Sequence, residues 1–478
     1  MALLVCVVVA ATDCSVGPKY RKPSVQVPVT YKEQPPAGWK TAQPQDAALR
    51  GKWWEIFGDQ QLNALEEQVN VSNQNVAVAE AQFRGARAAI RVARAGLFPT
   101  ITGGASVNRS HPSSNRAVRQ GVVLATTTDY NLPIDLSYEA DVWGRIRHTI
   151  EANLDNAQAT AADLEAVRLS MHSELALDFF HLQGLDAEKQ LLDSTVAAYQ
   201  KALDLTTNRY NQGIVARVDV TQAETQLATT RAQATDLAVQ RAQFEHAIAI
   251  LIGKPPSELT IAPGSMAAKA PAIPVSLPSE ILERRPDIAA AERHMASANE
   301  QIGVAKTAFY PTVALTGAAG LESSRLSNWL SWPSRFWSLG SSLVETAFDG
   351  GRRRAITREA QAAYDTTLAI YRQDVLTAFQ EIEDNLAALR ILDEEAKQHD
   401  EAVAAAEHSL SLATNRYRGG ITTYLEVITA QSVALANQRT AVDLLTRRMA
   451  ASVLLIKALG GGWSTSELPS PKDLTTTK

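Results

Sequence analysis

Two stretches of the chain carry apolar residues at a helical spacing over an unusual length. The first runs from Arg145 to about Asn211 without a proline. Apolar positions lie mostly three, four or seven residues apart, which is typical of a coiled-coil seam. At 1.5 Å per residue, about 65 helical residues span roughly 100 Å, far longer than an ordinary globular helix. The apolar positions are Leu164, Val167, Met171, Leu175, Phe179, Leu182, Leu192, Val196, Tyr199, Leu203 and Tyr210 in the first stretch, and Tyr364, Leu368, Tyr371, Val375, Ile382, Leu386, Leu389, Val403, Leu410 and Tyr417 in the second.

A glycine ends each long stretch, and a second helical pattern of roughly forty residues follows within a few positions. Gly213 ends the first stretch and Gly420 ends the second. Because glycine adopts the left-handed conformation without a steric penalty, each can stop its helix and reverse the chain. The sequence therefore predicts two helical hairpins, with tips that read RYNQGIVARVDV and RYRGGITTYLEV.

Alternation of apolar and polar residues predicts β-strands between the helical stretches. The clearest run begins at Tyr130 and places Leu132, Ile134, Leu136 and Tyr138 on one face and Asp135, Ser137 and Glu139 on the other. This pattern predicts a strand with one apolar face and one polar face that contacts water. The segments after Pro99 and Pro311 are rich in Thr, Gly, Ala and Val, and the segment from Trp337 to Asp349 places Trp337, Leu339 and Leu343 on one face. Together they bring the prediction to four long strands per chain.

Four aromatic residues cluster beside the last of these strands. They are Trp329, Trp332, Phe336 and Trp337. Aromatic side chains in such a position suit a girdle at a membrane interface. A packed cluster of loop side chains explains them equally well.

The chain matches itself at a shift of 207 residues, which predicts an internal duplication. The shift pairs Gly213 with Gly420, Asp219 with Glu426, and Gly253 with Gly460. Near the start of each copy, VARAGLFPT (92–100) faces VAKTAFYPT (304–312) at a shift of 212. Such a period is too long for a solenoid repeat, so we expect a duplicated half-protein.

The duplication divides the chain into six expected segments. They are a signal peptide at 1–13, a lipidated extended segment at 14–58, a first repeat at 59–265, a connection at 266–285, a second repeat at 286–462 and a C-terminal tail at 463–478. Each repeat is expected to contain a helix, two barrel strands and a long helical hairpin.

The first helix of each repeat has a recognisable start. Asp59 is positioned to cap a helix that continues toward Leu97. In the second repeat, Pro286 suits the first helical turn and Asp287 suits the positive helix start. Helix capping explains both motifs without a catalytic or binding role.

Charge and hydropathy narrow the possible partners. A net charge of -5 offers no basic surplus to neutralise a phosphate backbone, so nucleic acid is not an expected partner. No apolar run approaches the roughly 20 residues of a spanning helix. If the chain crosses a membrane, it must do so as a β-barrel.

Four strands per chain are too few to close a barrel, so the barrel must be shared. Open edges in lipid would leave backbone groups unpaired. Two copies would give about eight strands, with an interior filled by side chains, whereas three copies give about twelve and leave a lumen. The fold class is therefore a mixed α and β membrane protein, in which a trimeric twelve-stranded barrel is continued by a helical coiled-coil barrel.

Both cysteines lie at the N-terminus, as Cys6 and Cys14. The run from Ala2 to Ala11 has the length of a signal-peptide apolar region, which predicts Cys14 as a lipidated first residue of the mature chain. Asp13 departs from the small residue that lipoprotein signals prefer, and no Lys or Arg precedes the run. A buried cysteine in an ordinary N-terminus is the alternative.

No constellation in the sequence predicts catalysis, a metal site or a cofactor. The eight histidines include no HExxH motif. The glycine and lysine at 253 and 254 lack P-loop spacing, and GGRRR (350–354) is expected at a solvated strand-to-helix corner. The chain is therefore not expected to be an enzyme.

Several motifs together resemble the outer-membrane factors of tripartite efflux systems, the TolC/OprM-like group, specifically NodT-type outer-membrane lipoproteins. They are CSVGPKYRKP (14–23), KWWEIFGDQQLNAL (52–65), LFPT (97–100), DVWGRIR (141–147), LERRPDI (282–288), FDGGRRR (348–354) and the two hairpin tips. The resemblance implies a homotrimer in the outer membrane of a Gram-negative bacterium, with helices in the periplasm. It also implies a periplasmic adaptor, an inner-membrane pump and passive exit of small molecules.

A structural coiled-coil protein of the envelope, anchored by its barrel, is the alternative function. The polar strand face formed by Asp135, Ser137 and Glu139 favours a water-filled channel. A barrel that served only as an anchor would not need a row of polar residues on this face.

By the same resemblance, the second hairpin closes the tube at a periplasmic gate. The implied gate residues are Glu426, Thr429, Leu425, Tyr417 and Ser432, and the implied contacts with adaptor or pump at the tips are Gly213, Gly420, Arg209, Arg416 and Asp219. Glu426 and Thr429 are three residues apart and should share a helix face toward the lumen. The alternative for Glu426 is a solvated surface carboxylate.

Overall fold

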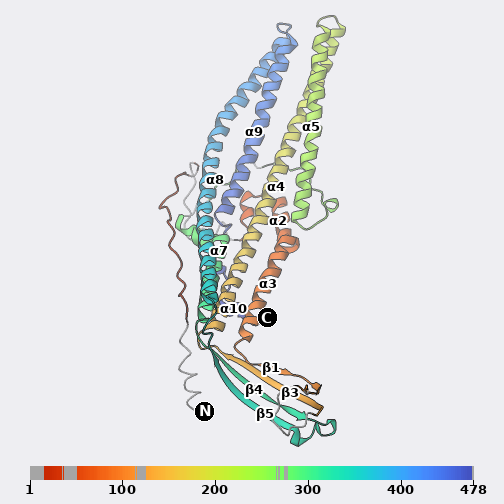
Figure 1. Cartoon of the computed structure of the whole chain (residues 1–478). Coiled ribbons are helices and arrows are strands. Elements are labelled where there is room, and N and C mark those ends of the chain that lie inside the picture. The colour runs from red at the N-terminus through yellow and green to blue at the C-terminus, as the bar shows by residue number, and fades with distance from the viewer. Residues whose placement is uncertain are drawn as a thin grey trace.

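Two long helical hairpins run from the junction with a curved antiparallel sheet to the opposite end of the molecule (Figure 1). The computed structural model describes residues 16–34, 36, 51–113, 115, 125–264, 266, 270–273 and 278–475. The first hairpin pairs α4 (Arg145–Asn211) with α5 (Arg217–Leu251), and the second pairs α8 (Arg352–Arg418) with α9 (Tyr424–Ala458). The predicted helical hairpins are therefore confirmed.

The two hairpins have the same dimensions. Helices α4 and α8 each contain 67 residues, and α5 and α9 each contain 35. Within the described ranges, no helix is both long and apolar enough to cross a bilayer.

Shorter helices pack around the lower half of the hairpins. They are α2 (Gln60–Ser72), α3 (Gln74–Ala95), α6 (Ile281–Arg284), α7 (Pro286–Thr307) and α10 (Pro471–Thr475), with 3-10 turns η2 (Trp53–Phe57), η3 (Pro256–Glu258), η4 (Pro278–Glu280) and η7 (Thr465–Glu467). Two further 3-10 turns, η5 (Leu326–Asn328) and η6 (Trp332–Ser334), lie in the loop between the last two strands of the sheet. Pro286 begins α7, as predicted.

The single helix predicted from Asp59 toward Leu97 is wrong, because the chain breaks at Asn73 into α2 and α3. The Asn73 side chain accepts hydrogen bonds from the backbone N–H groups of Asn75 and Val76 and so caps α3. Its amide also donates to the carbonyl of Leu251 at 2.7 Å. Asp59 caps α2 as predicted, by accepting from the backbone of Gln61 and Leu62.

The sheet contains β1 (Thr100–Gly103), β2 (Ser106–Ser110), β3 (Thr127–Ala140), β4 (Thr312–Ser323) and β5 (Arg335–Val344). Strands β1 and β2 both pair with β3, so they form one interrupted strand in a sheet of order β1/β2, β3, β4, β5. The four predicted strand positions are present. The last strand ends at Val344 rather than continuing to Asp349.

The antiparallel register separates an apolar face of the sheet from a polar one. One row across the strands contains Ile101, Leu136, Gly317 and Leu339. The neighbouring row, which points to the opposite face, contains Thr102, Asp135, Ala318 and Ser338. Ile101 is 65% exposed and Leu339 is 81% exposed, so the apolar face is uncovered in the protomer.

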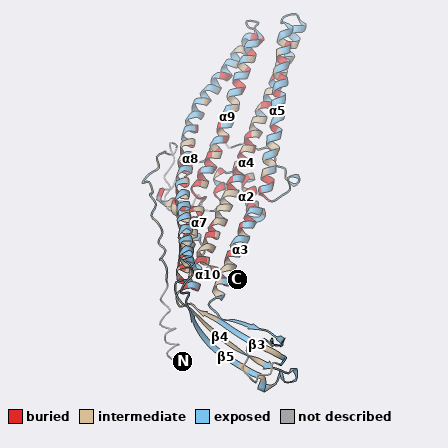
Figure 2. Cartoon of the chain, viewed as in Figure 1, coloured by how far each residue is buried: buried red, intermediate tan, exposed pale blue. Residues whose placement is uncertain are grey.

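The main hydrophobic core lies where the shorter helices meet the hairpins, and not in the sheet (Figure 2). Large buried side chains there include Trp53, Leu62, Phe179, Tyr371 and Ile382. The sheet itself carries only exposed and intermediate residues.

Carboxylates cap the start of both long helices at the strand-to-helix corners. Asp141 accepts hydrogen bonds from the backbone of Ile146 and Arg147, and Asp349 accepts from the backbone of Gly351 and Arg353. These hydrogen bonds lower the pKa of Asp349 below its ordinary value. The GGRRR segment therefore lies at the corner predicted for it.

Residues 16–34, here called the N-terminal strap, run beside α7 and α8. The backbone N–H of Val16 donates to the carbonyl of Trp143 at 3.2 Å, and Tyr20 Oη donates to Glu292 at 2.5 Å. Further along, the Glu383 carboxylate accepts from the backbone N–H groups of Lys32 and Glu33. Cys6, Cys14 and the expected signal peptide lie outside the described residues.

Candidate functional site at the hairpin tips

Each hairpin reverses direction at a left-handed glycine. Gly213 has φ of 73° and Gly420 has φ of 74°, as the sequence predicted. The residue after each glycine donates its backbone N–H back into the long helix, from Ile214 to Arg209 and from Ile421 to Arg416. These hydrogen bonds satisfy carbonyl groups that would otherwise be unpaired at the helix end.

Three of the five predicted gate residues share one surface of the second hairpin. Leu425, Glu426 and Thr429 line a groove between α8 and α9, together with Arg416. Glu426 Oε2 lies 3.6 Å from Arg416 Nη1, and both side chains are about half exposed. Thr429 Oγ1 donates to the carbonyl of Leu425 at 2.9 Å, so its hydroxyl is already bonded within the helix.

Tyr417 does not line that groove, because it faces the first hairpin. It is only 4% exposed and lies in a buried cluster with Ala223, Tyr424 and Val427. The guanidinium of Arg209 lies 4.8 Å from the centre of the Tyr417 ring, and Arg209 Nη1 donates to the Tyr417 carbonyl at 2.7 Å. Arg209 and Tyr417 therefore join the two hairpins.

Other side chains extend this contact between hairpins. Thr206 Oγ1 lies 3.3 Å from Tyr417 Oη, and Gln226 Nε2 donates to Ser432 Oγ at 3.4 Å. Burial raises the pKa of Tyr424 to about 12, with the neighbouring Tyr417 adding a smaller contribution, so its hydroxyl stays protonated. Asp219 lies in the first turn of α5, where a carboxylate suits the positive helix end.

Sequence reasoning missed Thr206, Gln226 and Tyr424 as members of this contact. The seam spacing could not have identified Tyr424, because the turn at Gly420 separates it from the helix that contains Tyr417. Nothing in the local sequence pairs Thr206 or Gln226 with the second hairpin, because each partner lies more than 200 residues away.

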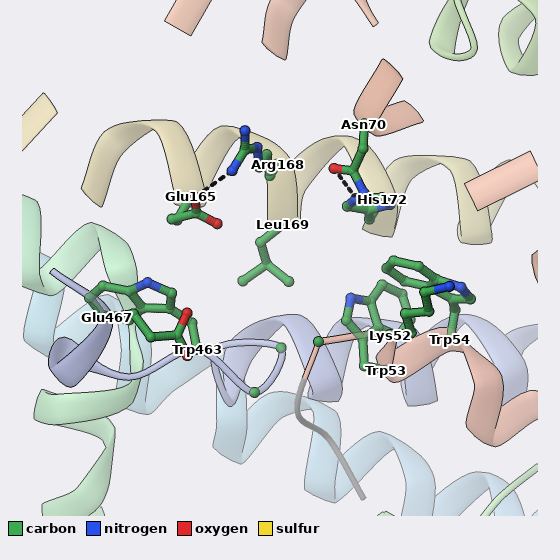
Figure 3. Close-up of a pocket in the computed structure, with 14 residues that line it drawn as sticks. Lys52, Trp53, Trp54, Asn70, Glu165, Arg168, Leu169, His172, Trp463 and Glu467 are labelled. Carbon is green, nitrogen blue, oxygen red and sulfur yellow. Dashed lines mark hydrogen bonds and ion pairs between the residues drawn. The ribbon is translucent and has the colours of Figure 1, made fainter. Parts of the chain in front are cut away.

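A second site lies halfway along the molecule, where η2, α4 and the turn after α9 enclose a cavity of about 470 Å³ (Figure 3). Trp54, Asn70, Arg168, His172 and Trp463 are among its lining residues. Trp54 belongs to the KWWEIFGDQQLNAL motif quoted above, but no site was predicted from any of these residues. Within the part of the chain that the structure describes, no group of three or more His, Cys, Asp or Glu side chains is arranged to hold a metal ion.

Comparison with known proteins identifies the family that shares this arrangement. Residues 65–254 and 277–461 match the family model described as outer membrane efflux protein. Outer membrane protein OprJ of Pseudomonas aeruginosa is 30% identical over 465 residues, which cover 97% of this chain and 95% of OprJ. Cation efflux system protein CusC of Escherichia coli is 28% identical over 461 residues, which cover 96% of this chain and 98% of CusC.

A solved structure agrees with the sequence relatives. The outer-membrane channel OprN superposes with a TM-score of 0.87 at 31% identity, over 94% of this chain and 100% of that chain. The Campylobacter jejuni CmeC channel shares the fold with a TM-score of 0.89 at 24% identity, over 95% of this chain and 96% of that chain. The chain therefore belongs to the outer membrane efflux protein family and acts as the outer-membrane channel of an efflux pump.

Proposed function

We propose that three copies of this chain form a passive exit duct, in which four strand positions per copy close a twelve-stranded barrel. The observation that supports this proposal is a sheet with one apolar and one polar face. Among the described residues of one copy, its outer strands β1/β2 and β5 have no hydrogen-bonded neighbour on their outer edges. In lipid, each unpaired backbone group costs several kcal/mol, so the edges must pair with neighbouring copies. Three copies leave a lumen, whereas two give about eight strands and a filled interior.

The faces of the sheet support a water-filled interior. The row with Ile101, Leu136 and Leu339 suits contact with lipid. The opposite row combines Asp135 with the small residues Ala318 and Ser338, which leave room for water. A purely structural anchor would not need this polar face, so the duct is favoured over the structural alternative.

The long hairpins are proposed to continue the barrel as a periplasmic tube. Their equal lengths, 67 residues for α4 and α8 and 35 for α5 and α9, also support the proposed duplication of the chain. The tips, which lie farthest from the sheet (Figure 1), would meet a periplasmic adaptor and an inner-membrane pump.

The course of the N-terminal strap supports lipidation at Cys14. Val16, two residues later, is bonded to Trp143 at the junction between sheet and helices. Val16 therefore lies at the base of the proposed barrel, where the inner leaflet of the outer membrane is expected, which suits an acyl anchor two residues earlier in the chain.

The cargo is proposed to be set by the pump. Relatives of 28 to 30% identity are named for different cargoes, namely cations for CusC, pyoverdine for OpmQ and toluene for TtgI. Because similar channels are named for such different cargoes, we expect the duct itself to select weakly, through local charges.

The gate is proposed at the groove formed by Leu425, Glu426 and Thr429. Three copies of Glu426 around a threefold axis would attract cations and repel one another. Arg416, at 3.6 Å, would partly neutralise each carboxylate, so the selectivity should be modest. Tyr417 would act indirectly, by holding the second hairpin against the first.

The test is the conductance and ion selectivity of the purified trimer in planar bilayers. Glu426→Gln should lower cation selectivity, and Arg416→Ala should raise it because the carboxylate loses its neutralising partner. Asp219→Asn serves as the matched control and should leave selectivity unchanged. Equal effects from Glu426→Gln and Asp219→Asn, or none from either, would remove Glu426 from the gate. A trimer that conducts in no variant would contradict the duct itself.

A further inference from the structure

A carboxylic acid group without a cationic partner is buried between α2 and α4. Glu66 is 0% exposed, and its Oε2 lies 2.7 Å from Nδ1 of His172. Its other carboxylate oxygen has no hydrogen-bond partner. None of the described Lys or Arg side chains forms an ion pair with Glu66. His172 is therefore the only basic group among the described residues that is close enough to exchange a proton with the Glu66 carboxyl group.

The second ring nitrogen of His172 determines where the protons lie. Its Nε2 is 3.1 Å from Oδ1 of Asn70 (Figure 3). An amide oxygen can only accept, so with Asn70 in this orientation we assign the hydrogen to Nε2. The ring also stacks on Trp54, with centroids 4.4 Å apart and an interplanar angle of 22°. The contact between Glu66 and Nδ1 therefore needs one proton of its own, whichever of the two atoms holds it.

The surrounding charged groups are engaged elsewhere. From α4, Arg168 pairs with Glu165 and with Glu80 of α3. Ahead of η2, Lys52 pairs with Glu67 of α2. On α9, Lys457 donates to Ser170, and Glu467 follows at the far wall of the cavity.

Burial raises the pKa of Glu66 well above its ordinary value. Burial, reinforced by the charge of Arg168, lowers the pKa of His172 to about 4. Both shifts favour a neutral acid beside a neutral imidazole.

We propose that the contact between Glu66 and His172 holds α2 against α4 in a pH-dependent way. The contact is stable only while a single proton lies between the carboxyl group and Nδ1. When that proton is lost, the carboxylate faces the lone pair of Nδ1 and the contact becomes repulsive. When a second proton is added, an imidazolium is buried without a counter-charge. His172 lines the cavity, which gives water a route to the pair.

The pH dependence follows from counting protons. When α2 opens, Glu66 and His172 return to ordinary pKa values of about 4.3 and 6.5. Between these values the open pair also holds one proton, so the opening equilibrium does not depend on pH. Above about 6.5 the open pair loses its proton while the closed pair keeps one, and opening increases about tenfold per pH unit. Below about 4.3 the open pair binds a second proton, so opening increases again as pH falls.

Hydrogen–deuterium exchange of α2 peptides in the purified full chain tests this proposal between pH 5 and 9. Rates are corrected for intrinsic exchange, and α7 peptides serve as the internal reference. Wild-type α2 should lose protection above about pH 6.5, by about tenfold per pH unit, relative to α7. Glu66→Gln, which permanently supplies an N–H donor to Nδ1, should abolish this alkaline loss.

His181→Gln is the matched control, because His181 is also on α4 but stacks on Phe244 and forms no ion pair with a carboxylate among the described residues. It should keep the wild-type alkaline loss. The proposal is overturned if wild-type α2 shows no alkaline loss, a result that needs no variant to fold. It is equally overturned if Glu66→Gln loses protection with the same pH profile as wild type.

Discussion

Glycines at the end of the returning helices have closer neighbours than the glycines at the tips. Gly253 and Gly460, which end α5 and α9, have φ of 70° and 91°. A Cβ on Gly253 would lie 2.2 Å from the carbonyl oxygen of Ser72, and a Cβ on Gly460 would lie 2.0 Å from that of Arg284. A Cβ on Gly213 would meet nothing within 4 Å. All three glycines have a left-handed backbone, but only Gly253 and Gly460 also lack space for a side chain, because backbone from another segment packs against them.

Gly253→Ala should therefore destabilise the protein more than Gly213→Ala. Both substitutions cost about 1 kcal/mol for an alanine in the left-handed region. Gly253→Ala should cost roughly 1–3 kcal/mol more, because the backbone of Ser72 must move. Thermal denaturation of the two variants measures the difference. Equal melting temperatures would show that the contact with Ser72 relaxes freely.

At the scale of elements, the two hairpins are joined near their tips by a small set of contacts. Arg209 of α4 donates to the carbonyl of Tyr417 on α8 and lies over its ring. A hydrogen bond from a charged group contributes about 1.5–3 kcal/mol, and a cation–π contact about 0.5–2 kcal/mol. Rotation of one hairpin against the other must break both contacts.

Arg209→Ala should increase the mean open conductance of the channel in planar bilayers, because the second hairpin is then held less firmly. Arg217→Ala is the matched control, since Arg217 lies 5.7 Å over the ring of Tyr210 within the first hairpin. It should leave the conductance unchanged. A conductance increase of the same size in both variants would argue that tip charge, rather than the contact between hairpins, controls opening.

At the scale of the whole molecule, the sheet has edges that need strands from neighbouring copies. Strand β5 and the β1/β2 pair have free edges in one copy. A single acyl chain gives only marginal membrane binding, whereas a closed barrel spans the bilayer. Assembly should therefore depend on the strands rather than on the lipid.

Cys14→Ala should still yield trimers in the outer membrane, and native mass measurement in detergent should give the mass of three chains. Labelling with a radioactive fatty acid should mark wild type and not the variant. Stable monomers from the wild type would contradict the shared barrel. Loss of trimers only in Cys14→Ala would show that the anchor is required for assembly.

Local periodicity and local composition were sufficient to predict the long helices and the strand positions. The proline-free stretch from Arg145 matches α4, and alternation from Tyr130 matches most of β3. Both patterns depend on residues only a few positions apart, where the helical and strand periods are encoded. The break at Asn73 was missed because the helical pattern continues through it, while the side chain caps the next helix and bonds to Leu251.

Tertiary structure alone decided which faces of these elements meet. The helical pattern put Tyr417 on the seam, but only packing turned it toward Arg209 and away from Glu426. Glu66 and His172 lie 106 residues apart, and each looks like an ordinary surface residue of a helix when taken alone. The sequence by itself determined the order of the elements and the lengths of the two longest helices, because those follow from short-range periodicity. The contacts between hairpins and the buried acid were decided by the fold, because they depend on the rotation and register with which distant helices pack.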